Sequence, residues 1–233
     1  MIMNKYDKNF SGAFRDPTIH RAAARSYIES VVGKLNGKKV LDVGCGSGYF
    51  SRILTAKGAK VVGIDNSKYQ IEIARSLEMK RNSGIDYRIS DAKKFKNTAP
   101  EKFDIVLMSF FLLELPKKGD VIKCLRSAND VLEKNGTLIL SEVHPHFINK
   151  SIEGTSFFMK NNKRYFDNGA LLKAQTKTIS GKKISFLDTH YTLEFLLNSL
   201  IECGFSIERV KEIPYFKERC PIGIVIVTRK VIK

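Results

Sequence analysis

The hydrophobic positions of this chain change period along its first 143 residues, and the change predicts alternating helices and strands. Apolar side chains recur every three or four residues from the helix-start signal Asp16-Pro17 to Leu35, which predicts a first helix. Short, continuous apolar runs and helical patterns then alternate, as is typical of parallel strands covered on both faces. Strands are predicted at 39–43, 60–65, 85–89, 103–108 and 137–143, with helices after the first glycine-rich turn, at 67–82 and at 118–134.

The pattern becomes irregular after Val143. Residues 144–190 have weak periodicity, scattered Gly and Asn and several aromatic residues, and we interpret them as an insertion with two or three short strands rather than a separate domain. Regular structure is predicted to resume with a helix at 192–203, followed by strands at 205–212 and 222–229.

A glycine-rich turn, GCGSG at 44–48, joins the first predicted strand to the next helix and is the clearest candidate ligand site. Glycine lets the backbone turn tightly and approach a ligand, which then lies at the helix N-terminus. The third glycine, Gly48, comes one residue too early for the dinucleotide motif Gly-x-Gly-x-x-Gly, and the lysine of a phosphate-binding P-loop is absent. The turn therefore favours neither a dinucleotide nor a P-loop phosphate site.

Three aspartates accompany the ends of successive predicted strands. Asp42 and Asp65 lie at the ends of the first two, and Asp91 follows the third. The carboxyl ends of parallel strands meet at one edge of the sheet, where ligands bind in such folds. A carboxylate at Asp65 can accept two hydrogen bonds from a ribose diol. These positions predict a nucleoside-containing ligand at this edge.

At this point the chain resembles the class I S-adenosylmethionine-dependent methyltransferases. The resemblance is carried over 36–143 by VLDVGCGSG, GID, SDA, FDIVLMS and LEKNGTLILSE, and it extends to 189–210 through THYTLEFLLNSLIECGFSIERV. It is strongest to the small-molecule branch that contains the ubiquinone and menaquinone biosynthesis enzymes. It implies an α/β fold with a Rossmann-like, doubly wound sheet of seven strands, mostly parallel, whose antiparallel last strand lies beside strand five.

This resemblance also implies the domain organisation and the cofactor. A single methyltransferase domain is expected over 1–233, with an N-terminal segment and helix at 1–35 and the insertion at 144–190 forming part of the acceptor site. The implied cofactor is S-adenosyl-L-methionine and the implied product is S-adenosyl-L-homocysteine. No metal site is expected.

The cofactor residues follow from the same resemblance. The glycine-rich turn would line the methionine part, Asp42 would reach its ammonium directly or through water, and Asp65 would hold the ribose hydroxyls. Asn66 would pack beside the adenine, and Asp91 with the backbone of Ala92 would recognise its amino edge. Met108 or Ser109 would offer a backbone carbonyl to the ammonium. The full set is Asp42, Gly44, Cys45, Gly46, Gly48, Asp65, Asn66, Asp91, Ala92, Met108 and Ser109.

Histidines supply the candidates for the chemistry at the acceptor. A hydroxyl acceptor must lose its proton, and histidine suits that role near neutral pH. Many relatives have a histidine about where Leu113 stands, so this chain departs from the pattern there, and the adjacent Glu114 is an alternative base. His144 and His190 come from two segments that the family topology brings over the same sheet edge, and we predict them as the catalytic residues.

Aromatic residues are abundant near these segments. We consider them as a wall for an apolar acceptor, beside the alternative that they belong to the core. The residues are Phe110, Phe111, Phe147, Phe157, Phe158, Tyr165 and Phe166.

Net charge and cysteine usage bear on partners and location. The formal net charge is +16, and lysine supplies 28 of the 40 basic residues without an arginine-rich stripe or basic tail, which favours a compositional bias over nucleic-acid binding. The first residues lack a signal-peptide pattern, the four cysteines form no Cys-x-x-Cys pair, and the longest apolar run, 105–115, is too short to span a membrane. A cytoplasmic location is expected, and the oligomeric state stays open.

Three functional interpretations follow. The first is a methyltransferase acting on a small molecule, with a hydroxyl as acceptor. The second is an RNA or protein methyltransferase, which only the charge favours, since MSFF at 108–111 stands where base and glutamine methyltransferases carry an Asn-Pro-Pro-Tyr type motif. The third is a non-catalytic protein that binds S-adenosylmethionine.

Overall fold

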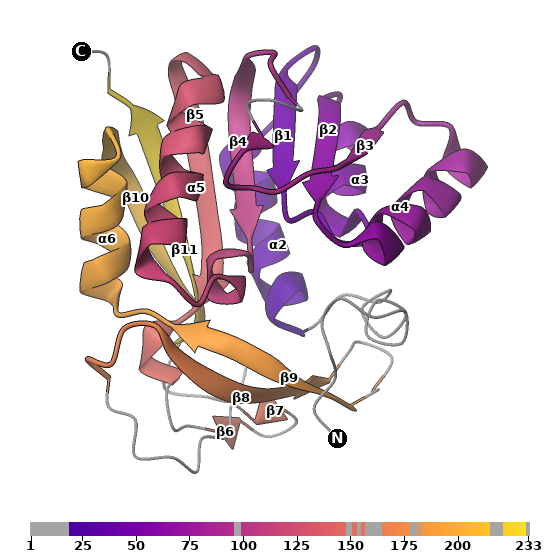
Figure 1. Ribbon diagram of the computed structural model, residues 1–233. Helices are drawn as coiled ribbons and strands as arrows, with labels where there is room; N and C mark the ends of the chain where they lie inside the picture. The colour runs from indigo at the N-terminus through magenta and orange to yellow at the C-terminus, as the bar shows by residue number, and fades with distance from the viewer. Residues whose placement is uncertain are drawn as a thin grey trace.

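The main sheet of the chain has the predicted seven strands (Figure 1). The computed structural model describes residues 19–95, 99–147, 151–152, 155–156, 165–177, 181, 183–214 and 221–231. The strand order is β10-β11-β5-β4-β1-β2-β3. The strands are β1 (Lys39–Val43), β2 (Lys60–Asp65), β3 (Asp86–Ile89), β4 (Phe103–Ser109), β5 (Leu132–Val143), β10 (Phe205–Pro214) and β11 (Pro221–Lys230).

The direction of the last strand is as predicted. β11 is antiparallel to both of its neighbours, β5 and β10, whereas the pairs formed by β1 to β5 are parallel. The Rossmann-like α/β architecture is thereby confirmed, and the carboxyl ends of the parallel strands lie at one edge of the sheet.

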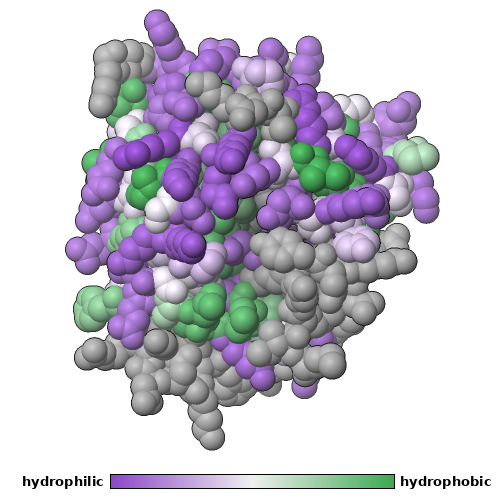
Figure 2. Space-filling model, viewed as in Figure 1, coloured by the Kyte–Doolittle hydropathy of each residue, from purple (hydrophilic) through white to green (hydrophobic). Residues whose placement is uncertain are grey.

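Helices cover both faces of this sheet (Figure 1). The helices α2 (Ile19–Val32), α3 (Tyr49–Ala56) and α4 (Lys68–Arg81) contribute to one buried cluster, and α5 (Lys118–Val131) and α6 (Leu193–Glu202) contribute to another. Each helix turns an apolar side toward the sheet, as its spacing predicts. The exposed side of α5 and α6 is mostly hydrophilic in Figure 2. Within the described residues, no helix combines the length and the apolar character needed to cross a membrane.

The boundary between α5 and β5 differs most from the prediction. The helix predicted to continue to 134 ends at Val131, and β5 begins at Leu132 because that residue pairs with Phe103 and is fully buried in the core. Asn135 then adopts a φ of 60°, and the strand regains regular pairing from Thr137. The predicted helix start at Asp16-Pro17 lies outside the described residues.

The insertion forms a second sheet rather than two or three short strands. It contains β6 (Ser151–Ile152), β7 (Thr155–Ser156), β8 (Ala170–Lys177) and β9 (Lys183–His190), in that order. The last two strands pair along eight residues each. Figure 1 shows that this pair crosses beneath the carboxyl ends of the main sheet. The short helix η2 (Leu112–Glu114) contacts β9. The insertion therefore covers the edge where the sequence predicts the ligand.

Candidate active site

The three glycines of the turn after β1 all have positive φ values, but a side chain would meet different surroundings at each. An added Cβ at Gly44 would lie 2.6 Å from the ring of Phe111, and one at Gly48 would collide with the ring of Tyr87. At Gly46, with φ at 55°, the nearest atoms would be 3.8 Å away. The lack of a side chain at Gly44 and Gly48 thus makes room for the rings of Phe111 and Tyr87, whereas at Gly46 it leaves room for a ligand.

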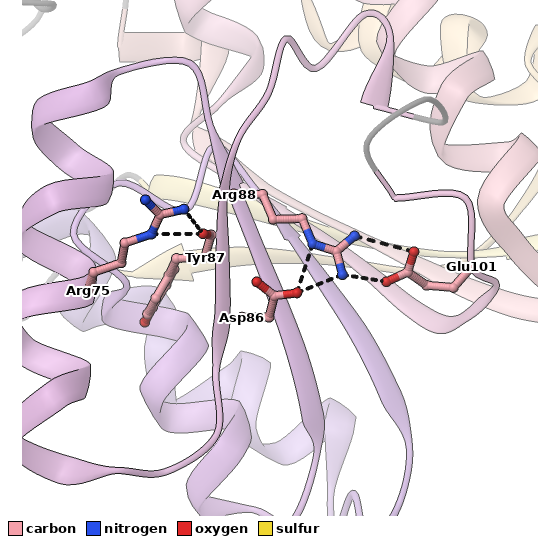
Figure 3. Close-up of polar contacts among 5 residues, drawn as sticks. All are labelled: Arg75, Asp86, Tyr87, Arg88 and Glu101. Atoms are coloured by element: carbon pink, nitrogen blue, oxygen red, sulfur yellow. Dashed lines mark hydrogen bonds and ion pairs between the residues drawn. The ribbon is translucent and has the colours of Figure 1, made fainter.

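Tyr87 reaches the glycine-rich turn from the edge strand β3, and its backbone is held in place from both sides (Figure 3). Its carbonyl accepts hydrogen bonds of 3.1 Å and 2.6 Å from Nε and Nη2 of Arg75 on α4. Next to it, Arg88 pairs with Asp86 and, through both terminal nitrogens, with Glu101. These contacts fix the strand whose tyrosine supports the turn.

Asp65 connects the end of β2 to the same turn. Its Oδ2 accepts a hydrogen bond of 2.9 Å from the Gly46 N–H, and its Oδ1 accepts one of 2.8 Å from the Ser67 N–H. Burial raises the pKa of this carboxyl, and the backbone N–H donors oppose the rise. Each oxygen retains acceptor capacity, because a carboxylate oxygen has two lone pairs.

A cavity of about 350 Å³ opens at this edge of the sheet. Six of the predicted cofactor residues line it, namely Gly44, Gly46, Asp65, Asn66, Asp91 and Ala92. A volume of this size falls in the range of small-molecule sites. The cavity lies where the strand-end pattern predicts the ligand.

The other five predicted cofactor residues are not among the residues that line this cavity. Asp42 is buried and accepts a hydrogen bond of 2.6 Å from the Ser51 hydroxyl, and burial raises its pKa to about 6. Gly48 precedes the first residue of α3. The other three, Cys45, Met108 and Ser109, are buried, the first in the glycine-rich turn and the last two on β4. Their implied contacts with a cofactor stay predictions.

The cavity is also lined by polar residues outside the predicted cofactor set, among them Arg21, Gln70 and Glu114. Arg21 comes from α2. Desolvation lowers the pKa of its guanidinium, and the negative charges of Asp42, Glu114 and Asp65 partly oppose this decrease. Gln70 is buried on α4, and its Oε1 has no hydrogen-bond partner among the described residues. A buried acceptor without a partner in a cavity is a site for a ligand donor.

A second, smaller cavity of about 50 Å³ lies under β9, and both predicted catalytic histidines line it. Its walls include four leucines, from η2, β8 and α6, and the carboxyl-bearing residues Glu142 and Asp188. The segment 110–116 lines both cavities, with Leu112 and Leu113 on the smaller one. The histidines therefore sit beside the larger cavity and not in its wall.

The two imidazoles are held differently. The Nδ1 of His144 accepts a hydrogen bond of 3.2 Å from the His146 N–H, so its protonated Nε2 faces Glu212, at 3.1 Å. The Nε2 of His190 donates to the Tyr165 carbonyl at 2.7 Å, because a carbonyl only accepts. This leaves Nδ1 of His190 with a lone pair and no hydrogen-bond partner within the described part of the chain. Burial lowers the pKa of both histidines, which keeps them neutral at pH 7.

The candidate aromatic wall is only partly assembled. Phe110 and Phe111 line the larger cavity, and the ring of Tyr165 packs against His190. Phe166 is 77% exposed and does not belong to either cavity. The side chains of the remaining three, Phe147, Phe157 and Phe158, lie outside the described residues. Across the described ranges there is also no group of three or more His, Cys, Asp or Glu side chains that could hold a metal ion.

The sequence matches known methyltransferases. Residues 34–186 match a family model described as a methyltransferase domain. A ubiquinone biosynthesis O-methyltransferase from Actinobacillus pleuropneumoniae is 33% identical over 148 residues, which cover 62% of this chain and 61% of that protein. A protein of the same name from Pseudomonas putida is 29% identical over 76% of this chain and 80% of its own length. The chain thus spans less than two thirds of the Actinobacillus relative.

Solved structures agree on the fold. An S-adenosylmethionine-dependent methyltransferase from Mesorhizobium loti has a TM-score of 0.66 at 24% identity, covering 89% of this chain and 98% of that one. A magnesium protoporphyrin IX methyltransferase from Synechocystis, crystallised with bound S-adenosylhomocysteine, has a TM-score of 0.61 at 19% identity, covering 90% and 84%. The chain therefore belongs to the methyltransferase domain family and has the fold of the S-adenosylmethionine-dependent methyltransferases.

Proposed function

We propose that this protein transfers a methyl group from S-adenosylmethionine to a hydroxyl group of a small molecule. The observation that carries the proposal is the arrangement of two adjacent cavities. The larger one has the glycine-rich turn and Asp65 in its wall, and the smaller one has His190. The names of the relatives, which are O-methyltransferases of ubiquinone biosynthesis, support oxygen as the accepting atom.

The residues around the larger cavity suit this cofactor. Arg21 would bind the carboxylate of the methionine part, since it is a half-buried cation in the wall of this cavity. Asp65 would accept from the ribose hydroxyls, and Asp91 with Ala92 would lie along the adenine. Gly46 leaves space for the ligand, and the buried Oε1 of Gln70 is available to a donor on it. When bound, the cofactor supplies a methyl group already activated by its sulfonium.

The work left to the protein is to align the acceptor, exclude water and remove a proton. Leucines of the smaller cavity and the second sheet would shield the acceptor from solvent. His190 would take the hydroxyl proton on Nδ1, because its Nε2 is fixed on the Tyr165 carbonyl and its lowered pKa keeps it neutral. His144 would orient the loop after β5 instead, because both its ring nitrogens bond within the protein.

The test is a transfer assay with methyl-labelled S-adenosylmethionine and a cell extract divided into small-molecule, RNA and protein fractions. The proposal predicts label in the small-molecule fraction. Label mainly in RNA or protein would favour the alternative based on net charge, and binding of the cofactor without transfer to any fraction would favour a non-catalytic protein.

A further inference from the structure

The turn that follows β4 has an unusual backbone. Phe110 has a φ of 53°, a left-handed conformation that a bulky aromatic residue rarely adopts. Such a strained conformation persists only where the surrounding structure holds it. One constraint is a hydrogen bond of 2.6 Å from the Phe110 N–H to the carbonyl of Ser141 on β5.

A second constraint is the carboxyl group of Glu142, the next residue of β5. Its Oε1 accepts hydrogen bonds from the N–H groups of Phe111, at 3.1 Å, and Leu112, at 2.7 Å. The side chain is buried, and its Oε2 has no hydrogen-bond partner among the described residues. A buried carboxyl is costly unless it is well bonded, and here its bonds are made to the turn and not to the sheet.

The turn held in this way shapes both cavities. The Phe111 ring packs against Gly44, so that an added Cβ there would lie 2.6 Å from it. Phe110 and Phe111 line the larger cavity, whereas Leu112 lines the smaller one. If the two N–H groups lost their acceptor, the turn could relax from its strained form and move the wall that separates the cavities.

We propose that Glu142 is a positioning residue that fixes the turn at 110–112 and thereby the wall between the cofactor cavity and the smaller cavity. It acts through the backbone of Phe111 and Leu112 and removes no proton from the acceptor. The inference rests on the proposed use of the larger cavity for S-adenosylmethionine and is independent of the acceptor's identity.

The test compares three substitutions that nearly conserve side-chain shape. Glu142→Met removes the acceptor for the two N–H groups but keeps the volume, and Glu142→Gln keeps an amide oxygen that can accept both bonds. Thr228→Val is the control, because it removes a buried hydrogen bond of 3.1 Å to the Leu138 carbonyl elsewhere in the sheet. Each variant is measured by calorimetric titration with S-adenosylhomocysteine and by hydrogen exchange of the Phe111 and Leu112 amides.

Glu142→Met is expected to weaken S-adenosylhomocysteine binding about fivefold or more and to speed exchange of both amides. Glu142→Gln should stay within about twofold of the wild type in affinity and retain slow exchange, as should Thr228→Val. Unchanged amide exchange in Glu142→Met, or a Gln variant as defective as the Met variant, would overturn the positioning role. A wild type that shows slow exchange but no binding would instead refute the cofactor assignment, because exchange reports on the turn alone.

Discussion

The backbone N–H of Gly46 donates a hydrogen bond of 2.9 Å to Oδ2 of Asp65, which joins the glycine-rich turn after β1 to the end of β2. One carboxylate thus holds the turn and faces the cavity. Asp65→Ala should therefore weaken binding of S-adenosylhomocysteine about tenfold or more, since a hydrogen bond to a charged group contributes about 1.5–3 kcal/mol. Calorimetric titration measures the change.

Asp104 provides the matched control for this substitution. It also accepts a backbone hydrogen bond, of 2.9 Å from Lys39, but it lies near the start of β4 at the opposite edge of the sheet. Asp104→Ala should lower stability without changing affinity for S-adenosylhomocysteine. Equal affinity in both variants would show that Asp65 does not contact the ligand.

The role of Gly46 in leaving space for the ligand can be separated from its role in allowing a left-handed backbone, by comparison with Gly84. An alanine at Gly46, where φ is 55°, and one at Gly84, where φ is 83°, would both be strained in the left-handed region, at about 1–2 kcal/mol each. An added Cβ at Gly84 meets no atom within 4 Å, and Gly84 does not line the cavity. Thermal unfolding should therefore show similar losses, whereas only Gly46→Ala should lose S-adenosylhomocysteine affinity. Normal binding by Gly46→Ala would place the ligand elsewhere.

The Glu142 carboxyl predicts a pH dependence of stability. Burial, followed by the charges of Asp188 and Glu114, raises its pKa to about 8 from an ordinary value of 4.5, against the two backbone donors. Between these values the folded protein retains a proton that the unfolded chain has lost. The free energy of unfolding should thus fall as pH rises through this window, by at most about 1.4 kcal/mol per pH unit, and level off above pH 8.

Denaturant titrations of the wild type and Glu142→Gln from pH 5 to pH 8.5 isolate this contribution, because other groups titrate in both proteins. The stability of the wild type relative to the variant should decline across the window. A constant difference would mean that this carboxyl ionises near its ordinary pKa in the folded protein.

The histidines are distinguished by their hydrogen bonds. His190→Ala should lower kcat about 100-fold or more if Nδ1 removes the acceptor proton, with cofactor affinity nearly unchanged. The loss should be partly recovered at high pH, where solvent deprotonates a hydroxyl. His144→Ala should have a smaller effect on kcat, since neither of its ring nitrogens is available. Full turnover by His190→Ala would leave Glu114 or alignment alone as the basis of catalysis.

The sequence predicted those features that depend on local pattern. Continuous apolar runs located the parallel strands, and the glycines with the strand-end aspartates located the edge where the larger cavity lies. The sequence did not reveal Arg21, because its place in the wall of the larger cavity depends on how α2 packs against β11, β10 and β5. Gln70 was equally hidden, since only the packing of α4 leaves its Oε1 buried beside Gly46.

The second sheet was underestimated for a different reason. The buried residues of β9 are Phe186, Asp188, Thr189 and His190, so three of the four are polar. This removes the usual contrast between apolar inward and polar outward positions. Pairing with β8 and burial against η2 make those polar residues part of the smaller cavity.

The central claim is methyl transfer from S-adenosylmethionine to a hydroxyl of a small molecule, and it is tested most directly by the NMR spectrum of the product formed from a ¹³C-methyl-labelled cofactor. The wild type should give a labelled small molecule whose carbon shift is that of a methyl bound to oxygen, and His190→Ala should give far less of it at neutral pH. A methyl bound to nitrogen or carbon, or label found only in RNA or protein, would contradict the account.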